Sequence, residues 1–204
     1  RGRFRVRWAP MTDAEVVRLE SVHGVHVLSV HEVENFFLHP GTVELLLAQN
    51  GRGGESALEI IRAAADAHAG GWAYQFAMSS ANARRLPDVA AAAKGLAKGL
   101  QWTQLSNERN SSLDRVVAAS GLDSDSREQL RAILNIGIDA YSRSRSEPTL
   151  WKTCEGKQVL NDVARALGFA GAAAYARAAF AAWSREGVPL PDEVAELRSY
   201  LIAL

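Results

Sequence analysis

The densest group of polar side chains lies at residues 31–40, His-Glu-Val-Glu-Asn-Phe-Phe-Leu-His-Pro. Glu32 and Glu34 are two residues apart, so an extended segment would point both carboxylates to one side. Together with the amide of Asn35 they offer hard oxygen ligands, which suit Mg²⁺ or Mn²⁺. The alternative is a helix start, where acidic residues favour the helix dipole and Asn serves as a cap. Composition alone favours the helix start.

A second candidate is Lys157, which follows Gly156 at the predicted start of a helix. A lysine in a metal-dependent nuclease can stabilise the charge that develops on a phosphate, and glycine lets the backbone come close to it. Alternatively, Gly156 marks a turn and Lys157 is a solvated residue of the first helical turn. Because a cation is poorly placed at a helix start, the functional interpretation gains slightly.

The elements that must position segment 31–40 precede it in the sequence. Residues 24–30 are rich in β-branched residues and predict a strand. Residues 1–8 alternate between arginine and apolar residues with period two, which predicts a half-buried strand, and Thr12-Asp13-Ala14-Glu15 is a capping box. Strand, helix and strand in this order form a parallel βαβ unit, whose sites lie beyond the carboxyl ends of its strands.

The arginine face of the first strand has two interpretations. Arg3, Arg5 and Arg7 could face nucleic-acid phosphates, or they could be a solvated strand face that discourages edge pairing. The second is favoured, because no aromatic residue is interleaved on this face to stack on bases.

Composition excludes several classes of protein. Lys plus Arg equal Asp plus Glu at 23 each, which argues against a dedicated nucleic-acid coat protein. A single cysteine, Cys154, excludes an internal disulfide and fits a cytoplasmic location. The longest apolar stretch, 169–183, is interrupted by Arg177 and shorter than the roughly 20 residues of a membrane span. No Gly-x-x-x-x-Gly-Lys-Ser/Thr motif is present, so no ATP site is expected, and the histidines have no zinc-ligand spacing.

After Pro40 the pattern is helical to the end of the chain. The expected fold class is therefore α+β tending to mainly α, with a short parallel α/β start followed by a helical domain. We expect a boundary near residue 50, with domains 1–50 and 51–204. Trp151, between a polar linker at 142–148 and an apolar helix, is expected to be buried. The predicted helices are 42–49, 55–68, 72–85, 88–101, 111–120, 124–141, 157–167, 170–186 and 192–203.

Three elements resemble the TOPRIM domain of OLD-type (overcoming lysogenization defect) nucleases. Glu32-Val33-Glu34-Asn35-Phe36-Phe37-Leu38 after a strand resembles their Glu-x-Glu-Asn-Tyr-Leu-Leu segment. Residues 150–160, with a Trp followed by Gly-Lys, and residues 191–197 resemble later elements of the same family. The resemblance covers most of the chain in order, with only helical character between residues 50 and 145.

The resemblance implies a TOPRIM-like start at residues 1–50 and the carboxy-terminal part of a metal-dependent nuclease of anti-phage defence. It implies Glu32 and Glu34 as metal ligands, Glu34 and Lys157 as catalytic residues, and Mg²⁺ or Mn²⁺ as the cofactor. The implied partners are an ABC-type ATPase domain or subunit, DNA or RNA, and, as an option, a second copy of the chain.

One departure from the family pattern concerns the strand before the first helix. The family carries an Asp-x-Asp pair there, whereas this chain reads Arg5-Val6-Arg7-Trp8. Two divalent ions need several carboxylates, so we expect this chain alone to be inactive. Because the sequence starts at Arg1 in the middle of strand-like text, we also expect an upstream part of the protein. The alternative function is an inert helical interaction or sensor module with a degenerate TOPRIM start.

Overall fold

The computed structural model describes residues 3–6, 25–28, 32–79, 97–185, 188 and 190–195. The expected mainly helical character is confirmed, because every regular element described after Pro40 is a helix. No helix in this part of the chain is long and apolar enough to cross a membrane.

Two short strands form the β-structure of the described residues. β1 (Arg3–Val6) pairs in parallel with β2 (Val25–Leu28), with Arg3 opposite Val25 and Arg5 opposite Val27. The helix expected from the capping box at Thr12 lies outside the described residues. A two-stranded pair has no feature specific to a TOPRIM domain, so the family-specific start is not supported by the fold.

The segment after β2 differs from the extended conformation expected for the two glutamates. Glu32 is extended, with φ −135° and ψ 153°, and then η1 (Val33–Leu38) forms a 3₁₀ helix that carries Glu34 in its first turn. The prediction that both carboxylates project from one extended segment is therefore wrong. The physical reason is the side chain of Asn35, which accepts a hydrogen bond from the Glu32 N–H and favours a helix start.

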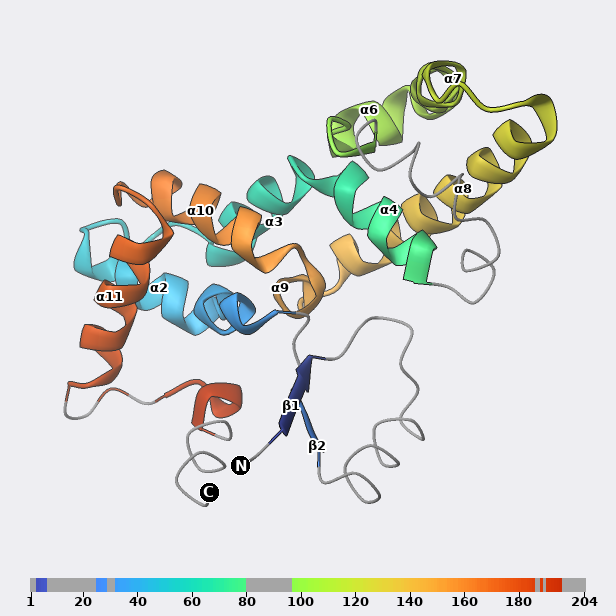
Figure 1. Cartoon of the computed structure of the whole chain (residues 1–204). Coiled ribbons are helices and arrows are strands. Elements are labelled where there is room, and N and C mark those ends of the chain that lie inside the picture. Colours follow the sequence, from blue (N-terminus) through green and yellow to red (C-terminus); the bar gives the residue numbers. More distant parts are fainter. Residues whose placement is uncertain are drawn as a thin grey trace. The chain divides into compact units, whose positions relative to one another are not determined.

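The chain divides into two compact units, and the division differs from the boundary expected near residue 50. Unit 1 contains residues 1–64 and 149–204, and unit 2 contains residues 65–148. Unit 1 is discontinuous because its late helices return to its early ones: α9 and α10 pack on η1, and α11 packs on α2 (Figure 1). Its helices are α2 (Pro40–Gln49), most of α3 (Ala57–Asp66), α9 (Leu150–Thr153), α10 (Gly156–Ala166) and α11 (Ala172–Trp183).

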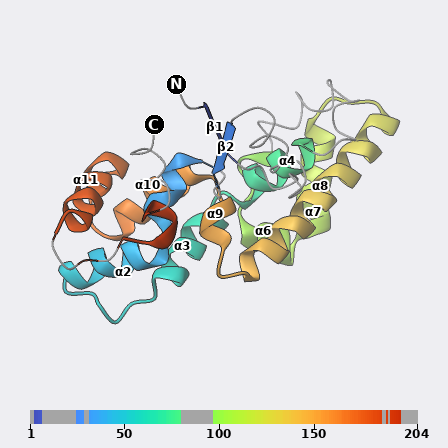
Figure 2. The same cartoon turned by 90° about the horizontal axis from the view of Figure 1, so that it is seen from below.

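Unit 2 is built around two helices that lie side by side, α4 (Ala69–Ser79) and α8 (Ser124–Ser146) (Figures 1 and 2). Their backbones approach closely where Gly137 faces the carbonyl group of Ala73, and a Cβ atom at Gly137 would overlap that carbonyl. The other helices described in the unit are α6 (Trp102–Asn107) and α7 (Arg109–Ala119). The helix expected at 88–101 lies largely outside the described residues.

The expected polar linker at 142–148 is mostly helical, because α8 continues to Ser146. Arg145 explains the extension, since its guanidinium binds the carboxylate of Asp66 with nitrogen–oxygen distances of 2.8 and 2.9 Å. The hydroxyl of Tyr141 donates to the same carboxylate at 3.1 Å. A hydrophobic pattern does not reveal an ion pair one turn beyond the last apolar contact, so the predicted helix at 124–141 ended too early.

Candidate functional site

Asn35 is the centre of the candidate site and is completely buried. Its amide nitrogen donates to the carbonyl oxygens of Trp151, at 2.5 Å, and Cys154, at 3.2 Å. Its amide oxygen accepts from the Glu32 N–H at 2.8 Å. Asn35 therefore ties η1 to the chain around α9, more than a hundred residues later. Trp151 is 4% exposed, which confirms the expectation that it is buried.

Glu32 joins the same contact from the other side. Its carboxylate oxygen Oε2 accepts a hydrogen bond from the backbone N–H of Lys157 at 2.9 Å. This N–H is one of the first in α10, where no partner exists within the helix, and the negative charge also suits the helix dipole. The carboxylate of Glu32 thus caps the backbone of α10. This role resembles the helix-start alternative, except that the capped helix is α10 and not the one that follows Glu32 directly.

Gly156 is required at this contact for a steric reason. A Cβ atom there would lie 2.5 Å from the amide oxygen of Asn35 and 3.1 Å from Oε2 of Glu32. The sequence interpretation held that glycine lets the backbone approach a phosphate. In the structure the groups that approach it are the side chains of Asn35 and Glu32.

The two remaining site residues of unit 1 are placed as follows. Glu34 is half-buried within the first turn of η1, and the side chain of Lys157 is exposed at the start of α10. Glu32 is the link between them, two residues from Glu34 in sequence and hydrogen-bonded to the backbone of Lys157. Within residues 32–79, 97–185 and 190–195, no three His, Cys, Asp or Glu side chains are grouped to hold a metal ion. The carboxylate set offered by this stretch is thus smaller than two divalent ions need.

The arginines of the first strand are only partly described. Arg3 and Arg5 lie two residues apart in β1 and so occupy the same face of the strand. Arg7 lies outside the described residues. The position of these residues relative to a nucleic acid remains a prediction.

Cys154 is buried next to the site but is not suited to nucleophilic chemistry. Burial raises the pKa of its thiol well above the ordinary range, and the nearby Glu32 carboxylate raises it further. Its sulfur lies 3.4 Å from the amide nitrogen of Asn35, within the buried contact. A thiol kept protonated is a poor nucleophile and a poor metal ligand.

A neighbouring polar cluster was not identified from the sequence. His39 caps α2, with its Nδ1 accepting from the Gly41 N–H at 3.1 Å and its Nε2 lying 3.4 Å from Oε2 of Glu193. Lys152 binds the other carboxylate oxygen of Glu193 at 2.7 Å. Because Nδ1 is an acceptor, the proton of neutral His39 is on Nε2 and is directed to Glu193. The signal in the sequence was the pair His39-Pro40, a cap followed by proline at the first helical position.

The electrostatics of His39 combine opposing effects. Burial lowers the pKa of the imidazole, Glu193 raises it and Lys152 lowers it, and burial outweighs the attraction of Glu193. The pKa of Glu193 is lowered, because the hydrogen bond and charge of Lys152 outweigh its burial. The cluster therefore contains a neutral imidazole held between a backbone donor and a carboxylate. Neither ring nitrogen is available for acid–base catalysis.

Comparisons with family models, curated proteins and solved structures give no match for this chain.

Proposed function

We propose that this chain is the carboxy-terminal part of a metal-dependent TOPRIM-type nuclease, coupled to an ABC-type ATPase and acting in anti-phage defence. The observation that supports the proposal is the contact of Glu32 and Asn35 with the segment 151–157. Two of the three sequence elements that carry the family resemblance lie far apart in the chain and are joined by direct hydrogen bonds.

In this proposal each residue has a distinct role. Asn35 and Glu32 position the Gly156–Lys157 turn, and Glu34 supplies a carboxylate to a divalent ion. Mg²⁺ or Mn²⁺ would polarise the scissile phosphate and activate water when bound. The ammonium group of Lys157 stabilises the charge that develops on the phosphate oxygens. Further acidic ligands come from outside the described residues.

The test uses the complete protein together with its ATPase and a supercoiled plasmid, in Mg²⁺ or Mn²⁺. Glu34→Gln and Lys157→Ala are each expected to reduce cleavage at least about a hundredfold, the size of a lost charge-stabilising group. Glu44→Gln and Lys98→Ala change exposed residues of the same types and should cleave normally. If the wild-type protein cleaves the plasmid and both site variants cleave it fully, the assignment is overturned.

The second candidate is a catalytically inert interaction or sensor module. It is favoured by one observation, that the carboxylate of Glu32 is used by the backbone of α10. Titration of the complete protein with Mn²⁺, followed by electron paramagnetic resonance, separates the two functions. Binding that is lost in Glu34→Gln supports the nuclease, and the absence of binding supports the inert module.

A further inference from the structure

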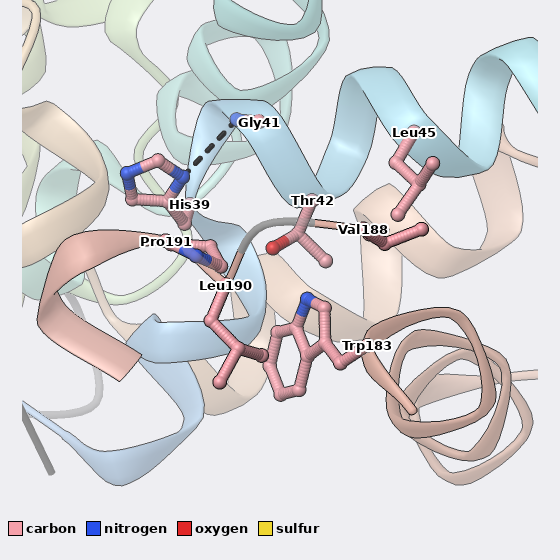
Figure 3. A pocket seen from close by; sticks show the side chains of 8 residues that line it. All are labelled: His39, Gly41, Thr42, Leu45, Trp183, Val188, Leu190 and Pro191. Carbon is pink, nitrogen blue, oxygen red and sulfur yellow. Dashed lines mark hydrogen bonds between the residues drawn. The ribbon is translucent and has the colours of Figure 1, made fainter. Parts of the chain in front are cut away.

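A small cavity of about 300 Å³ lies in unit 1 between the start of α2, the end of α11 and residues 188, 190 and 191 (Figure 3). Its walls are mainly apolar and include Leu45, Val188, Leu190 and the indole of Trp183. The volume is at the lower end of the range for small-molecule sites. No side chain that lines it carries a full charge, since His39 is neutral near pH 7.

Two polar atoms at this cavity are buried without a hydrogen-bond partner among the described residues. They are the hydroxyl oxygen of Thr42 and the indole nitrogen of Trp183. Thr42 is 1% exposed. Figure 3 shows its hydroxyl and the indole N–H on the facing walls of the same cavity. A buried polar group without a partner costs about 1–3 kcal/mol, so two at one cavity call for a specific explanation.

We propose that this cavity binds a small neutral molecule with an apolar body and one oxygen acceptor, such as a ketone. The indole N–H can only donate, and the Thr42 hydroxyl can donate as well, so a single carbonyl oxygen with two lone pairs satisfies both. An anion is disfavoured, because the lining offers no cation to compensate for its desolvation. The proposal is independent of nuclease activity.

The geometry also says what must move when the molecule binds. Both polar atoms are shielded from water in the present structure, so water does not satisfy them. For a carbonyl group to reach them, side chains that line the cavity have to shift. His39 cannot supply the missing partner, because its ring nitrogens are directed to the Gly41 N–H and to Glu193.

The test follows the indole N–H of Trp183 by ¹H–¹⁵N NMR in the full chain, with Trp183→Phe assigning its signal among those of the 5 tryptophans. The probes are acetophenone and ethylbenzene, which have nearly the same size but differ in the carbonyl oxygen. Acetophenone should shift the signal saturably, with a Kd on the order of 1 mM for so few atoms. Ethylbenzene should bind roughly tenfold more weakly, as expected for lost hydrogen bonds.

Thr42→Val removes the hydroxyl at constant shape and should weaken acetophenone about fivefold while leaving ethylbenzene unchanged. Thr42→Ser keeps the hydroxyl and should retain the affinity, which keeps the test valid if the valine variant folds poorly. Three results overturn the proposal. The first is no shift with acetophenone, and the second is equal affinity for both probes. The third is a Trp183 signal that shifts in Thr42→Val without any probe, which would show that the Thr42 hydroxyl and the indole N–H bond to each other.

Discussion

The contacts inside unit 1 differ in kind from the contacts inside unit 2. Unit 1 is assembled from two distant stretches, and polar side chains bind backbone groups of the other stretch. Examples are Asn35 on the carbonyl of Trp151, and Tyr175, whose hydroxyl donates to the carbonyl of Phe37 at 2.9 Å. Unit 2 is one continuous stretch, in which helices meet by close backbone approach and by ion pairs such as Arg145 with Asp66.

This difference explains where candidate functional residues can be found. Closing a discontinuous unit leaves backbone groups at segment ends, and in unit 1 polar side chains satisfy them. Glu32 and Asn35, which the sequence suggested as candidate functional residues, are among these side chains that bind backbone groups. In unit 1 a single substitution can therefore lower both the stability of the fold and a possible activity, so a test has to measure the two effects separately.

The largest effect is expected for Asn35→Ala. The change removes the Asn35 donor from the buried carbonyl groups of Trp151 and Cys154, and the Trp151 carbonyl keeps, among the described residues, only the weak thiol donor of Cys154 at 3.5 Å, so we expect a loss of about 3 kcal/mol. Urea denaturation measures it, and hydrogen exchange should show lost protection in unit 1 while α4 and α8 keep theirs. The matched control is Asn50→Ala, which removes one part-buried bond to the carbonyl of Leu167 and should cost about 1 kcal/mol. Equal losses in the two variants would contradict the central role of Asn35.

Gly137→Ala tests the other kind of contact, the close approach of α4 and α8. The added methyl group meets the carbonyl of Ala73, which is backbone and cannot rotate away, so we expect a loss of about 2 kcal/mol. Thermal unfolding measures it. Gly99→Ala is the control, because no atom lies within 4 Å of the added group there. A Gly137→Ala protein as stable as the wild type would show that the helices separate easily.

A smaller effect is expected for Glu32→Gln. The amide oxygen still accepts from the Lys157 N–H, but the negative charge at the start of α10 is lost, which costs about 0.5 kcal/mol. Glu34→Gln should leave the melting temperature nearly unchanged, because Glu34 has no comparable hydrogen bond to a distant segment among those described. Calorimetry of both variants distinguishes them. A larger loss in Glu34→Gln than in Glu32→Gln would reverse the assigned roles.

Local patterns in the sequence predicted much of the helical part of the fold. The helix expected at 42–49 is α2, which begins two residues earlier at Pro40, and the apolar periodicity of residues 157–167 placed α10 almost to the residue. Trp151 was expected to be buried because it stands between a polar stretch and an apolar helix, and it is. These features depend on neighbours in sequence, which is why they could be read.

Features that depend on distant partners could not be read in this way. The carboxylate of Glu32 caps a helix 125 residues later, so its role was invisible to spacing rules. The return of residues 149–204 to unit 1 depends on the same long-range contacts, and the expected boundary at residue 50 missed it. His39 was assigned no role from the sequence, because its partner Glu193 lies near the other end of the chain.

His39 gives the smallest effect and a pH dependence within unit 1. Burial holds the pKa of its imidazole below the usual 6.5, against the attraction of Glu193. The unfolded chain therefore binds more protons between the lowered pKa and 6.5, so the contribution of His39 is complete above pH 6.5 and is lost as the pH falls below it. Protonation also turns Nδ1 from an acceptor into a donor that faces the Gly41 N–H. Facing charges from Glu193, Lys152, Asp192 and Glu44 are part of this balance, and Glu193, whose pKa is lowered, loses its contribution only at lower pH, below about 4.5.

Urea denaturation between about pH 5 and 8 should show stability that falls with acid in the wild type and falls less in His39→Asn, which keeps an acceptor at the cap but does not titrate. Identical pH dependence in the two proteins would show that the imidazole has the same pKa in the folded and unfolded states, and the cap would then be a contact of no electrostatic consequence.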